Sequence, residues 1–433
     1  MLIEFRVANF RSFKGEQVFS LVASKDSSCP GNLIPCEKFN LLKGAVIYGP
    51  NASGKSNLVK AISFMDWFIR NSATRMNQGD KIEDIIPFRL AVESKTQPSL
   101  FEITMLVKGV RYEYGFTATT DRVFDEWLVA CPPDGRRQRW LERQCNLETG
   151  ATSWAFRGPL KSVKKILRER TRDNGLALSR GAELNIKLLS DLFMWIREKL
   201  WVFDLSNRPV ALMHKTAERF KHDHIFRERV IELVRQADFG IERITVGDDF
   251  IRPQDLPEKL KSLLSEKAVR DMVSSSFNVH TIHKVHGTDI EERFDFEKDE
   301  SNGTQRFFAF AGPFLDALSR GVVMIVDELE SNMHPLLTRK LVELFQSPEA
   351  NRRGAQLILA THDSTLMEPT LFRRDQIWLV EKNEKGASEI FSLYDFKPKD
   401  RPRSTEAFQK HYMSGRYGGV PSFGPIFENL EIN

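Results

Sequence analysis

The residues with the clearest chemical purpose lie between Gly49 and Ser56, where the chain reads Gly-Pro-Asn-Ala-Ser-Gly-Lys-Ser. This stretch fills every fixed position of the phosphate-binding pattern G-x-x-x-x-G-K-[ST]. Glycines let backbone N–H groups surround phosphate oxygens, and the N-terminus of a following helix adds positive potential. We expect Lys55 to neutralise the terminal phosphates and Ser56 to coordinate Mg²⁺ through its hydroxyl. The residues expected to contact the nucleotide are Gly49, Pro50, Asn51, Ala52, Ser53, Gly54, Lys55, Ser56 and Asn57.

A pair of acids far downstream could complete such a site. A phosphate-binding loop needs an acidic residue that organises the metal, usually at the end of another buried strand. The run VVMIVDELE at 322–330 ends in Asp327 and Glu328. We expect Asp327 to hold Mg²⁺ and Glu328 to be the general base that orients and deprotonates the attacking water. Taken alone, the pattern is equally typical of a strand that ends in two solvated acids.

Two further stretches carry residues suited to phosphate chemistry. QLILATHDS at 356–364 is an apolar strand followed by His362, whose neutral imidazole could bond a γ-phosphate and polarise the water. Ser301-Asn-Gly303-Thr-Gln305 precedes a helical stretch, and a Ser and a Gly at a helix start can form an anion site. The alternatives stay open: His362 could be an ordinary structural histidine, and Ser301 could simply cap a helix.

Periodic segments indicate the elements that position these residues. Ala45–Tyr48 suits a buried strand before the glycine-rich loop, and Asn57–Phe68 suits a helix after it. Other segments predict strands at 99–107 and 110–119, a turn at 131–138, helices within 160–172, 184–205 and 227–241, and mixed strands with a basic helix at 241–300.

We therefore predict an α/β fold in three parts. Residues 1–130 would carry the first part of the nucleotide-binding core and a β-rich lobe, 131–300 an inserted, mainly helical lobe, and 301–433 the rest of the core. His280, His283 and His286 could form a zinc site, but the Val and Thr content around them favours a polar strand.

Composition places the chain among ordinary globular proteins. Of its 433 residues, 41% are hydrophobic and 28% charged, and the net charge is only +4. No apolar run approaches the roughly 20 residues that span a bilayer, so we expect a cytoplasmic protein. The four cysteines form no metal-binding pattern, and we expect them to be reduced. The basic stretches 161–172 and 401–419 could contact a nucleic-acid backbone or could be solvated faces.

The order of the motifs resembles the ABC-type ATPase head. In that class, Ser301–Gln305 matches the signature loop, Asp327 and Glu328 match the second Walker motif, 330–334 the D-loop and His362 the switch histidine. The resemblance implies ATP hydrolysis between two subunits, where Ser301, Gly303 and Gln305 of one copy cap the nucleotide of the other. The protein would then be a homodimer or higher oligomer using ATP and Mg²⁺. Thr304 replaces the usual second signature glycine, which implies slow or partner-dependent hydrolysis.

The start of the chain narrows the class. FRVANFRSFKG at 5–15 is similar to the first strand of the RecF, SMC and OLD branch, and it marks Arg11 and Ser12 as candidate nucleotide contacts. Softer patterns at 85–90, 99–116, 175–185, 373–398 and 412–421 resemble compact AAA/OLD-like (RloA-like) ATPases of anti-phage and abortive-infection modules. This resemblance implies control of a separately encoded effector, either a nuclease or a TOPRIM-like protein. Glu183 stands where relatives often have a Gln, so no Q-loop residue is assigned. A RecF-like DNA-binding ATPase of replication or repair is the alternative.

Overall fold

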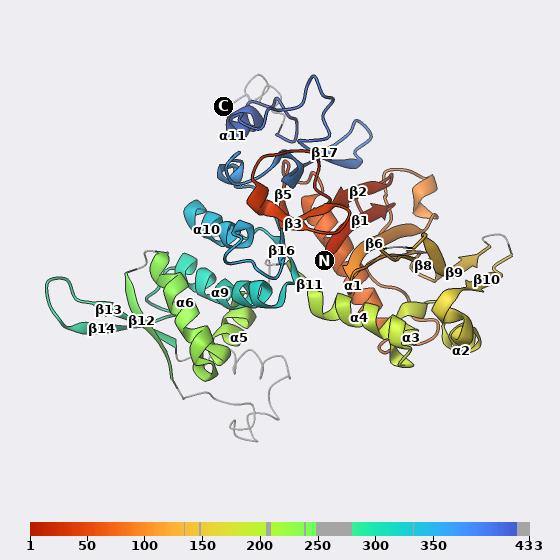
Figure 1. Cartoon of the computed structure of the whole chain (residues 1–433), viewed down its shortest axis with the longest axis horizontal. Helices are drawn as coiled ribbons and strands as arrows, with labels where there is room; N and C mark the ends of the chain where they lie inside the picture. Colours follow the sequence, from red (N-terminus) through yellow and green to blue (C-terminus); the bar gives the residue numbers. More distant parts are fainter. Residues whose placement is uncertain are drawn as a thin grey trace, which may run out of the picture. The chain divides into compact units, whose positions relative to one another are not determined.

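The computed structural model describes residues 1–133, 135–146, 149–204, 209–237, 240–247, 279–331 and 333–421. Contacts between residues divide the chain into two compact units (Figure 1). The first unit comprises Met1–Phe203, Gly321–Glu328 and Glu343–Asn433, and the second comprises Asp204–Arg320 and Leu329–Val342. Both units interleave in the sequence, so distant segments build each of them.

A six-stranded sheet forms the centre of the first unit. Its strand order is β11-β15-β16-β5-β17-β18, and β15, β16, β5 and β17 run parallel. The strands are β11 (Leu200–Asp204), β15 (Val323–Asp327), β16 (Gln356–Ala360), β5 (Gly44–Tyr48), β17 (Ile377–Lys382) and β18 (Ser388–Ser392). Every residue of β5, β15 and β16 is buried, as expected for parallel strands covered on both faces.

A seven-stranded antiparallel sheet completes this unit, in the order β10-β9-β8-β7-β6-β1-β2. Its strands are β1 (Leu2–Ala8), β2 (Gln17–Ser20), β6 (Ser99–Val107), β7 (Val110–Ala118), β8 (Val123–Cys131), β9 (Gln138–Cys145) and β10 (Thr152–Phe156). A separate hairpin pairs β3 (Leu33–Pro35) with β4 (Asn40–Leu42). Helix α1 (Lys55–Asn71) contacts strands of both sheets and buries nine of its residues, which joins the two sheets into one core.

The remaining helices of the first unit are α2 (Lys164–Arg170), α3 (Ala177–Glu183), α4 (Lys187–Lys199) and α11 (Phe408–Met413). A buried carboxylate fixes the start of α3. Glu126 accepts hydrogen bonds from the backbone N–H groups of Ala177 (2.8 Å) and Leu178 (3.1 Å) and from the Tyr114 hydroxyl (2.9 Å). A carboxylate at a helix N-terminus satisfies donors that have no partner within the helix.

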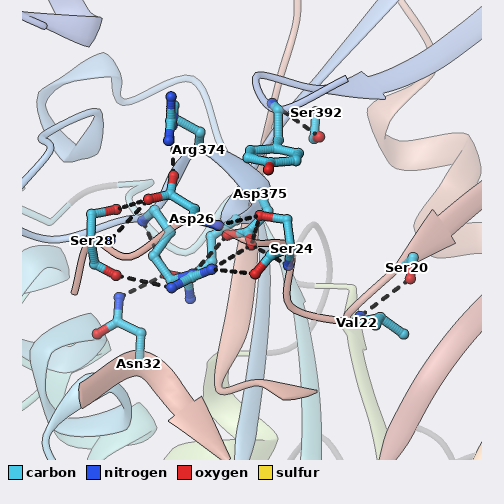
Figure 2. Close-up of polar contacts among 12 residues, drawn as sticks. Ser20, Val22, Ser24, Asp26, Ser28, Asn32, Arg374, Asp375 and Ser392 are labelled. Atoms are coloured by element: carbon cyan, nitrogen blue, oxygen red, sulfur yellow. Dashed lines mark hydrogen bonds and ion pairs between the residues drawn. The ribbon is translucent and has the colours of Figure 1, made fainter. Parts of the chain in front are cut away.

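A buried polar cluster joins segment 24–32 to segment 371–376 (Figure 2). Arg373 forms two hydrogen bonds with the Asp375 carboxylate (2.8 and 2.9 Å), which also accepts from the Ser24 hydroxyl (2.6 Å). Next to them, Asp26 accepts from Arg374 Nε (2.6 Å) and from both the backbone N–H (2.9 Å) and the hydroxyl (2.7 Å) of Ser28. Buried charges are stable only when paired in this way.

The second unit is a helical layer with a small sheet. It contains α5 (Pro209–His222), α6 (His224–Gln236) and α9 (Asn302–Arg320), and the sheet of β12 (Ile241–Val246), β13 (Val279–Lys284) and β14 (Glu291–Asp295). Gly312 of α9 lies against Thr216 of α5, and an added Cβ at Gly312 would collide with the Thr216 side chain. Helix α10 (Pro335–Gln346) begins in this unit and ends in the first.

The predicted α/β class is confirmed, and one element differs from expectation. The helical pattern predicted for 184–205 ends at Lys199, and Leu200–Asp204 forms β11 at the edge of the parallel sheet. Apolar, aromatic and β-branched residues in LWVFD suit a strand once a neighbouring strand is available. The basic helix expected within 241–300 falls largely outside the described residues, and the domain limits at 130 and 300 stay a prediction. Within the described ranges, no helix is long and apolar enough to cross a membrane.

Candidate active site

The glycine-rich loop connects β5 directly to α1, as the sequence predicts. At two positions the loop has no room for a side chain. An added Cβ at Gly49 would collide with Val380 O, and one at Gly54, where φ is +123°, would collide with the Ser388 hydroxyl. Ser388 also donates a hydrogen bond to Ser53 O. The loop is therefore held closely against the adjacent strands β17 and β18.

Lys55 lies at the start of α1 and folds back over this loop. Its ammonium group, which is buried, donates to Gly49 O (2.6 Å) and Pro50 O (3.3 Å). The first α-helical bond of α1 runs from Leu58 N to Gly54 O (3.1 Å), so the preceding N–H groups stand at the helix start, where phosphates bind. The buried Ser53 hydroxyl has no hydrogen-bond partner among the described residues.

The loop 9–13 lies beside the start of α1. Asn57 donates from Nδ2 to the Ser12 hydroxyl (2.8 Å), and Ser12 O accepts from Ser388 N (2.8 Å). Arg11 has a φ of +52°, and its N–H donates to Ile86 O (2.7 Å). A cavity of about 320 Å³ opens here. Its lining includes Arg11, Ser12 and Asn57, together with the basic residues Arg89 and Lys382. The structure thus places Arg11 and Ser12 next to the glycine-rich loop, in a basic surrounding that suits an anion.

The acidic pair lies at the same edge of the sheet as this loop. Asp327 ends β15 and pairs in register with Ala360 of β16, which in turn pairs with Ile47 of β5. Two strand spacings separate Asp327 from Ile47, or roughly 10 Å. Asp327 is 9% exposed, whereas Glu328 is exposed.

Glu328 adopts an unusual backbone conformation. Its φ is +56°, and its N–H donates to Ala360 O (2.9 Å). A residue other than glycine in the left-handed region costs energy, and such positions often occur at functional sites. This turn directs the chain away from the sheet directly after the buried Asp327.

His362 follows β16, the strand that lies between β15 and β5. Thr361 N donates to Ile47 O (3.1 Å), so the chain still runs beside β5 at this point. His362 is exposed, and Asp363 caps the short 3-10 helix Ser364–Leu366 by accepting from Thr365 N (2.9 Å). The loop, the acidic pair and His362 therefore share one edge of one sheet, although their catalytic roles stay predictions.

Ser301–Gln305 belongs to the second unit. Ser301 caps α9, because its hydroxyl accepts from Thr304 N (3.1 Å). Thr304 is buried, and its hydroxyl bonds that of Ser301 (2.9 Å). Gln305 folds back and donates to Glu297 O (3.0 Å) and Glu300 O (3.1 Å). Ser301 is thus a helix cap, which was the alternative interpretation of this stretch. A role for Ser301, Gly303 and Gln305 in binding a nucleotide stays a prediction.

Two of the three histidines lie on a polar strand, and His286 falls in the turn that follows it. His280 and His283 lie on β13, and His283 Nε2 is 2.7 Å from Glu300 Oε1. Among the described residues, no group of three or more His, Cys, Asp or Glu side chains could hold a metal ion. His280 and His283 thus lie on the expected polar strand.

The residues at the sheet edge fit Mg²⁺. The candidate ligands are the Ser56 hydroxyl and the Asp327 carboxylate, and Mg²⁺ prefers oxygen ligands. In nucleotide sites this ion uses one or two protein ligands, with phosphates and water supplying the others. A site with few protein ligands is therefore what Mg²⁺–ATP requires.

Sequence reasoning did not identify Ser388, Arg89, Lys382 or Tyr48 as parts of this site. Ser388 touches Gly54 and holds Ser53, and the Tyr48 hydroxyl donates to Asp363 O (3.1 Å). These residues belong to no short pattern, since each meets the site through long-range contacts. Only the position of Tyr48, directly before Gly49, gave a signal that could have been used.

Comparisons with known proteins give a family and several similar folds. Residues 45–368 match a family described as "AAA domain, putative AbiEii toxin, Type IV TA system". A comparison with curated proteins gave no match. Among solved structures, an SMC head bound to the C-winged helix domain of ScpA is 15% identical, with a TM-score of 0.40 over 90% of this chain and 97% of that chain. The SMC head domain from Thermotoga maritima is 13% identical (TM-score 0.37, 90% and 98% covered). The recombination mediator protein RecF–ATPrS is 15% identical (TM-score 0.30, 90% and 98% covered).

Proposed function

We propose that this chain, which belongs to the AAA-domain family described as putative AbiEii toxin of a Type IV TA system, is a Mg²⁺-dependent ATPase that controls a separate effector. The observation that carries the proposal is the shared sheet edge. The glycine-rich loop, Asp327 with Glu328, and His362 follow three neighbouring parallel strands. Ligands bind outside the carboxyl ends of the strands in open α/β sheets.

Each residue at this edge has a distinct task in the proposed reaction. Lys55 exchanges its bonds to the loop carbonyls for the β- and γ-phosphates, and the N–H groups at the start of α1 hold the phosphate oxygens. Ser56 and Asp327 would hold Mg²⁺, which would supply positive charge against the charge that develops on the phosphates. Glu328 orients the water and takes its proton, and His362 bonds the γ-phosphate.

The signature residues act between copies of the chain in this proposal. Ser301, Gly303 and Gln305 of one copy cap the nucleotide bound by the other, so the active form is a homodimer or a higher oligomer. The Ser301 hydroxyl and the start of the 19-residue helix α9 provide donors for the γ-phosphate. Because Thr304 stands in place of a glycine, we expect slow or partner-regulated hydrolysis.

The effector part of the proposal rests on the family and on the sequence resemblance to anti-phage, abortive-infection ATPases. ATP binding would close the oligomer and hydrolysis would open it. The two states would control a nuclease or a TOPRIM-like protein encoded separately, in the cytoplasm of a bacterial cell.

The test is the native mass of the Glu328→Gln protein with and without ATP–Mg²⁺. This substitution removes the base and keeps the shape of the side chain, so hydrolysis should fall about 100-fold or more. We expect ATP–Mg²⁺ to convert the variant to a stable dimer or larger assembly that retains the product of an adjacent gene. The double variant Glu328→Gln/Lys55→Ala is the control and should stay unchanged. A Glu328→Gln protein that hydrolyses ATP at the parental rate, or one that never assembles, would refute the proposal.

One observation favours a second candidate function, a RecF-like ATPase that binds DNA. Helix α2 and the 3-10 helix before it, Gly158–Val163, form a basic face of the first unit. Its exposed basic side chains are Arg157, Lys161, Lys164, Lys165, Arg168 and Arg170. In the described part of the chain, none of these forms an ion pair. Exposed basic side chains without ion pairs, clustered in one short stretch of chain, suit a phosphate backbone.

Binding to duplex DNA at several KCl concentrations tests this second candidate. Replacing Lys164, Lys165 and Arg168 by Gln should lower both the affinity and its dependence on salt, because about three phosphate contacts are lost. A variant with Gln at Lys25, Lys95 and Lys399 has the same net charge and is the control. Equal DNA affinity in the two variants would exclude this face as the binding surface.

A further inference from the structure

Segment 407–420 packs against the loop that carries His362. Helix α11 buries Phe408 and Tyr412, which are 1% and 7% exposed. Gln409 N donates to Met367 O (3.2 Å), and Gln409 Nε2 donates to the Ser364 hydroxyl (3.4 Å). Two hydrogen bonds from one residue therefore fasten α11 to the 3-10 helix that follows His362.

A second contact joins α11 to the end of β5. The rings of Tyr412 and Tyr48 lie 5.7 Å apart, with an angle of 50° between their planes. Tyr48 is fully buried, and its hydroxyl donates to the carbonyl of Asp363 (3.1 Å). Tyr48 thus holds the main chain directly after His362, and Tyr412 packs against the ring that makes this bond.

The segment itself is fixed in place on the sheet. The Tyr412 hydroxyl donates to Gly419 O (2.7 Å), and Gly419 N donates to Glu381 Oε2 (3.2 Å) on β17. At Gly418 the φ is +74°, a backbone conformation that favours glycine, and an added Cβ would displace the Glu381 carboxylate. Strand β17 pairs directly with β5, the strand that ends in Tyr48. The segment is therefore connected to Tyr48 both through the Tyr412 ring and through β17.

We infer that Tyr48 and Tyr412 are positioning residues for His362, and that segment 407–420 is a built-in support of the switch loop. Neither residue contacts the phosphates in this inference. The Tyr48 hydroxyl fixes the main chain at Asp363 and so orients the imidazole of the adjacent His362. Tyr412 keeps the Tyr48 ring in place. The expected effect on kcat rests on the proposed ATPase function. The expected effect on the orientation of His362 does not.

The kinetic test compares Tyr48→Phe with the parental protein. The substitution keeps the ring and removes one hydrogen bond, and the rate falls roughly 2- to 12-fold if the whole contribution of that bond is lost from the transition state. We expect kcat to fall within that range while the Kd for ATP changes less than about two-fold. Tyr412→Ala should have the same effect, and Tyr412→Phe should restore most of the rate because the ring contact remains.

Two controls distinguish a change in the orientation of His362 from a general loss of structure. Tyr417→Phe removes a hydroxyl of the same segment that bonds Glu406 (3.0 Å) and not the switch loop, so it should leave kcat unchanged. In a His362→Ala background, Tyr48→Phe should cause no further loss, because the imidazole that it aims is absent. A full additional loss in that background would overturn the inference.

A readout that does not need hydrolysis keeps this inference independent of the proposed function. Histidine-selective NMR resolves the imidazole signal of His362, identified by its absence in His362→Ala. We expect Tyr48→Phe and Tyr412→Ala to shift this signal, and Tyr417→Phe to leave it unchanged. An unshifted signal refutes the positioning role. A shifted signal in a protein that lacks ATPase activity would refute the proposed function and keep the positioning role.

Discussion

Replacing Asp26 by Asn should reveal how much the polar cluster of Figure 2 stabilises the first unit. The Asp26 carboxylate is buried, which by itself raises the pKa. Hydrogen bonds from Arg374 and Ser28 oppose this effect and lower the pKa from 3.8 to about 2. Since the folded protein holds the charged form more tightly than the unfolded chain does, stability from this group is complete above pH 3.8. It is lost as the pH falls toward 2.

The magnitude follows from the same two pKa values. The gap between 3.8 and about 2 corresponds to at most about 2.4 kcal/mol at neutral pH. The Arg374 side chain is 17% exposed, so solvent screens the pair and reduces this figure; about 1–2 kcal/mol is a realistic expectation for Asp26→Asn. The Arg374 side chain keeps its bond to Pro402 O (2.8 Å), so the loss should not exceed this range greatly.

Urea unfolding of the parental protein and of Asp26→Asn at pH 7, 5, 4 and 3 measures this contribution. The difference in the free energy of unfolding should be constant from pH 7 to 5 and should shrink between pH 4 and 3. Lys25→Gln, at an exposed neighbouring position, is the control and should show no such trend. A difference that does not change with pH would show that lost packing, and not the charge of Asp26, causes the destabilisation.

Three other changes test separate parts of the structure. Gly54→Ala should abolish ATP binding in a calorimetric titration with the fold retained, because the new Cβ meets Ser388 at a φ that disfavours side chains; normal affinity would contradict the loop geometry. Ser301→Arg and Lys55→Ala should each be inactive, whereas a mixture of the two should regain activity through one intact composite site, unless both sites must act together. Glu126→Ala should lower the free energy of unfolding by about 3 kcal/mol, because buried donors lose their acceptor; a loss below about 1 kcal/mol would refute this.

Short-range chemistry was readable from the sequence. Gly49–Ser56 follows a local pattern, and the strand before it and the helix after it appear where the periodicity predicts them. The sequence placed Asp327 and His362 at strand ends because each follows a buried apolar run, and parallel strands bring these ends to one edge; their roles stay predictions. Here the local pattern and the tertiary structure agree.

Long-range contacts escaped the same reasoning. Ser388 meets Gly54 only because β18 folds beside β17, and Tyr412 meets Tyr48 only because segment 407–420 returns to the sheet. No spacing in the chain specifies such neighbours. The misread end of the helix at 184–205 has a related cause, since Leu200–Asp204 becomes a strand by pairing with a sheet whose other members lie far away in sequence.

The strand order has a consequence for protein synthesis. Strand β5 lies between β16 and β17, and the buried Gln356 side chain reaches back to Leu42 O across 314 residues of sequence. A ribosome therefore completes the glycine-rich loop long before it makes either neighbour of β5. Closing so long a loop is slow, and β5 cannot be buried in its sheet until these late strands emerge. The sheet edge that carries the glycine-rich loop is thus among the last features to form, because a chain that ends before residue 327 has this loop without Asp327, Glu328 or His362 beside it.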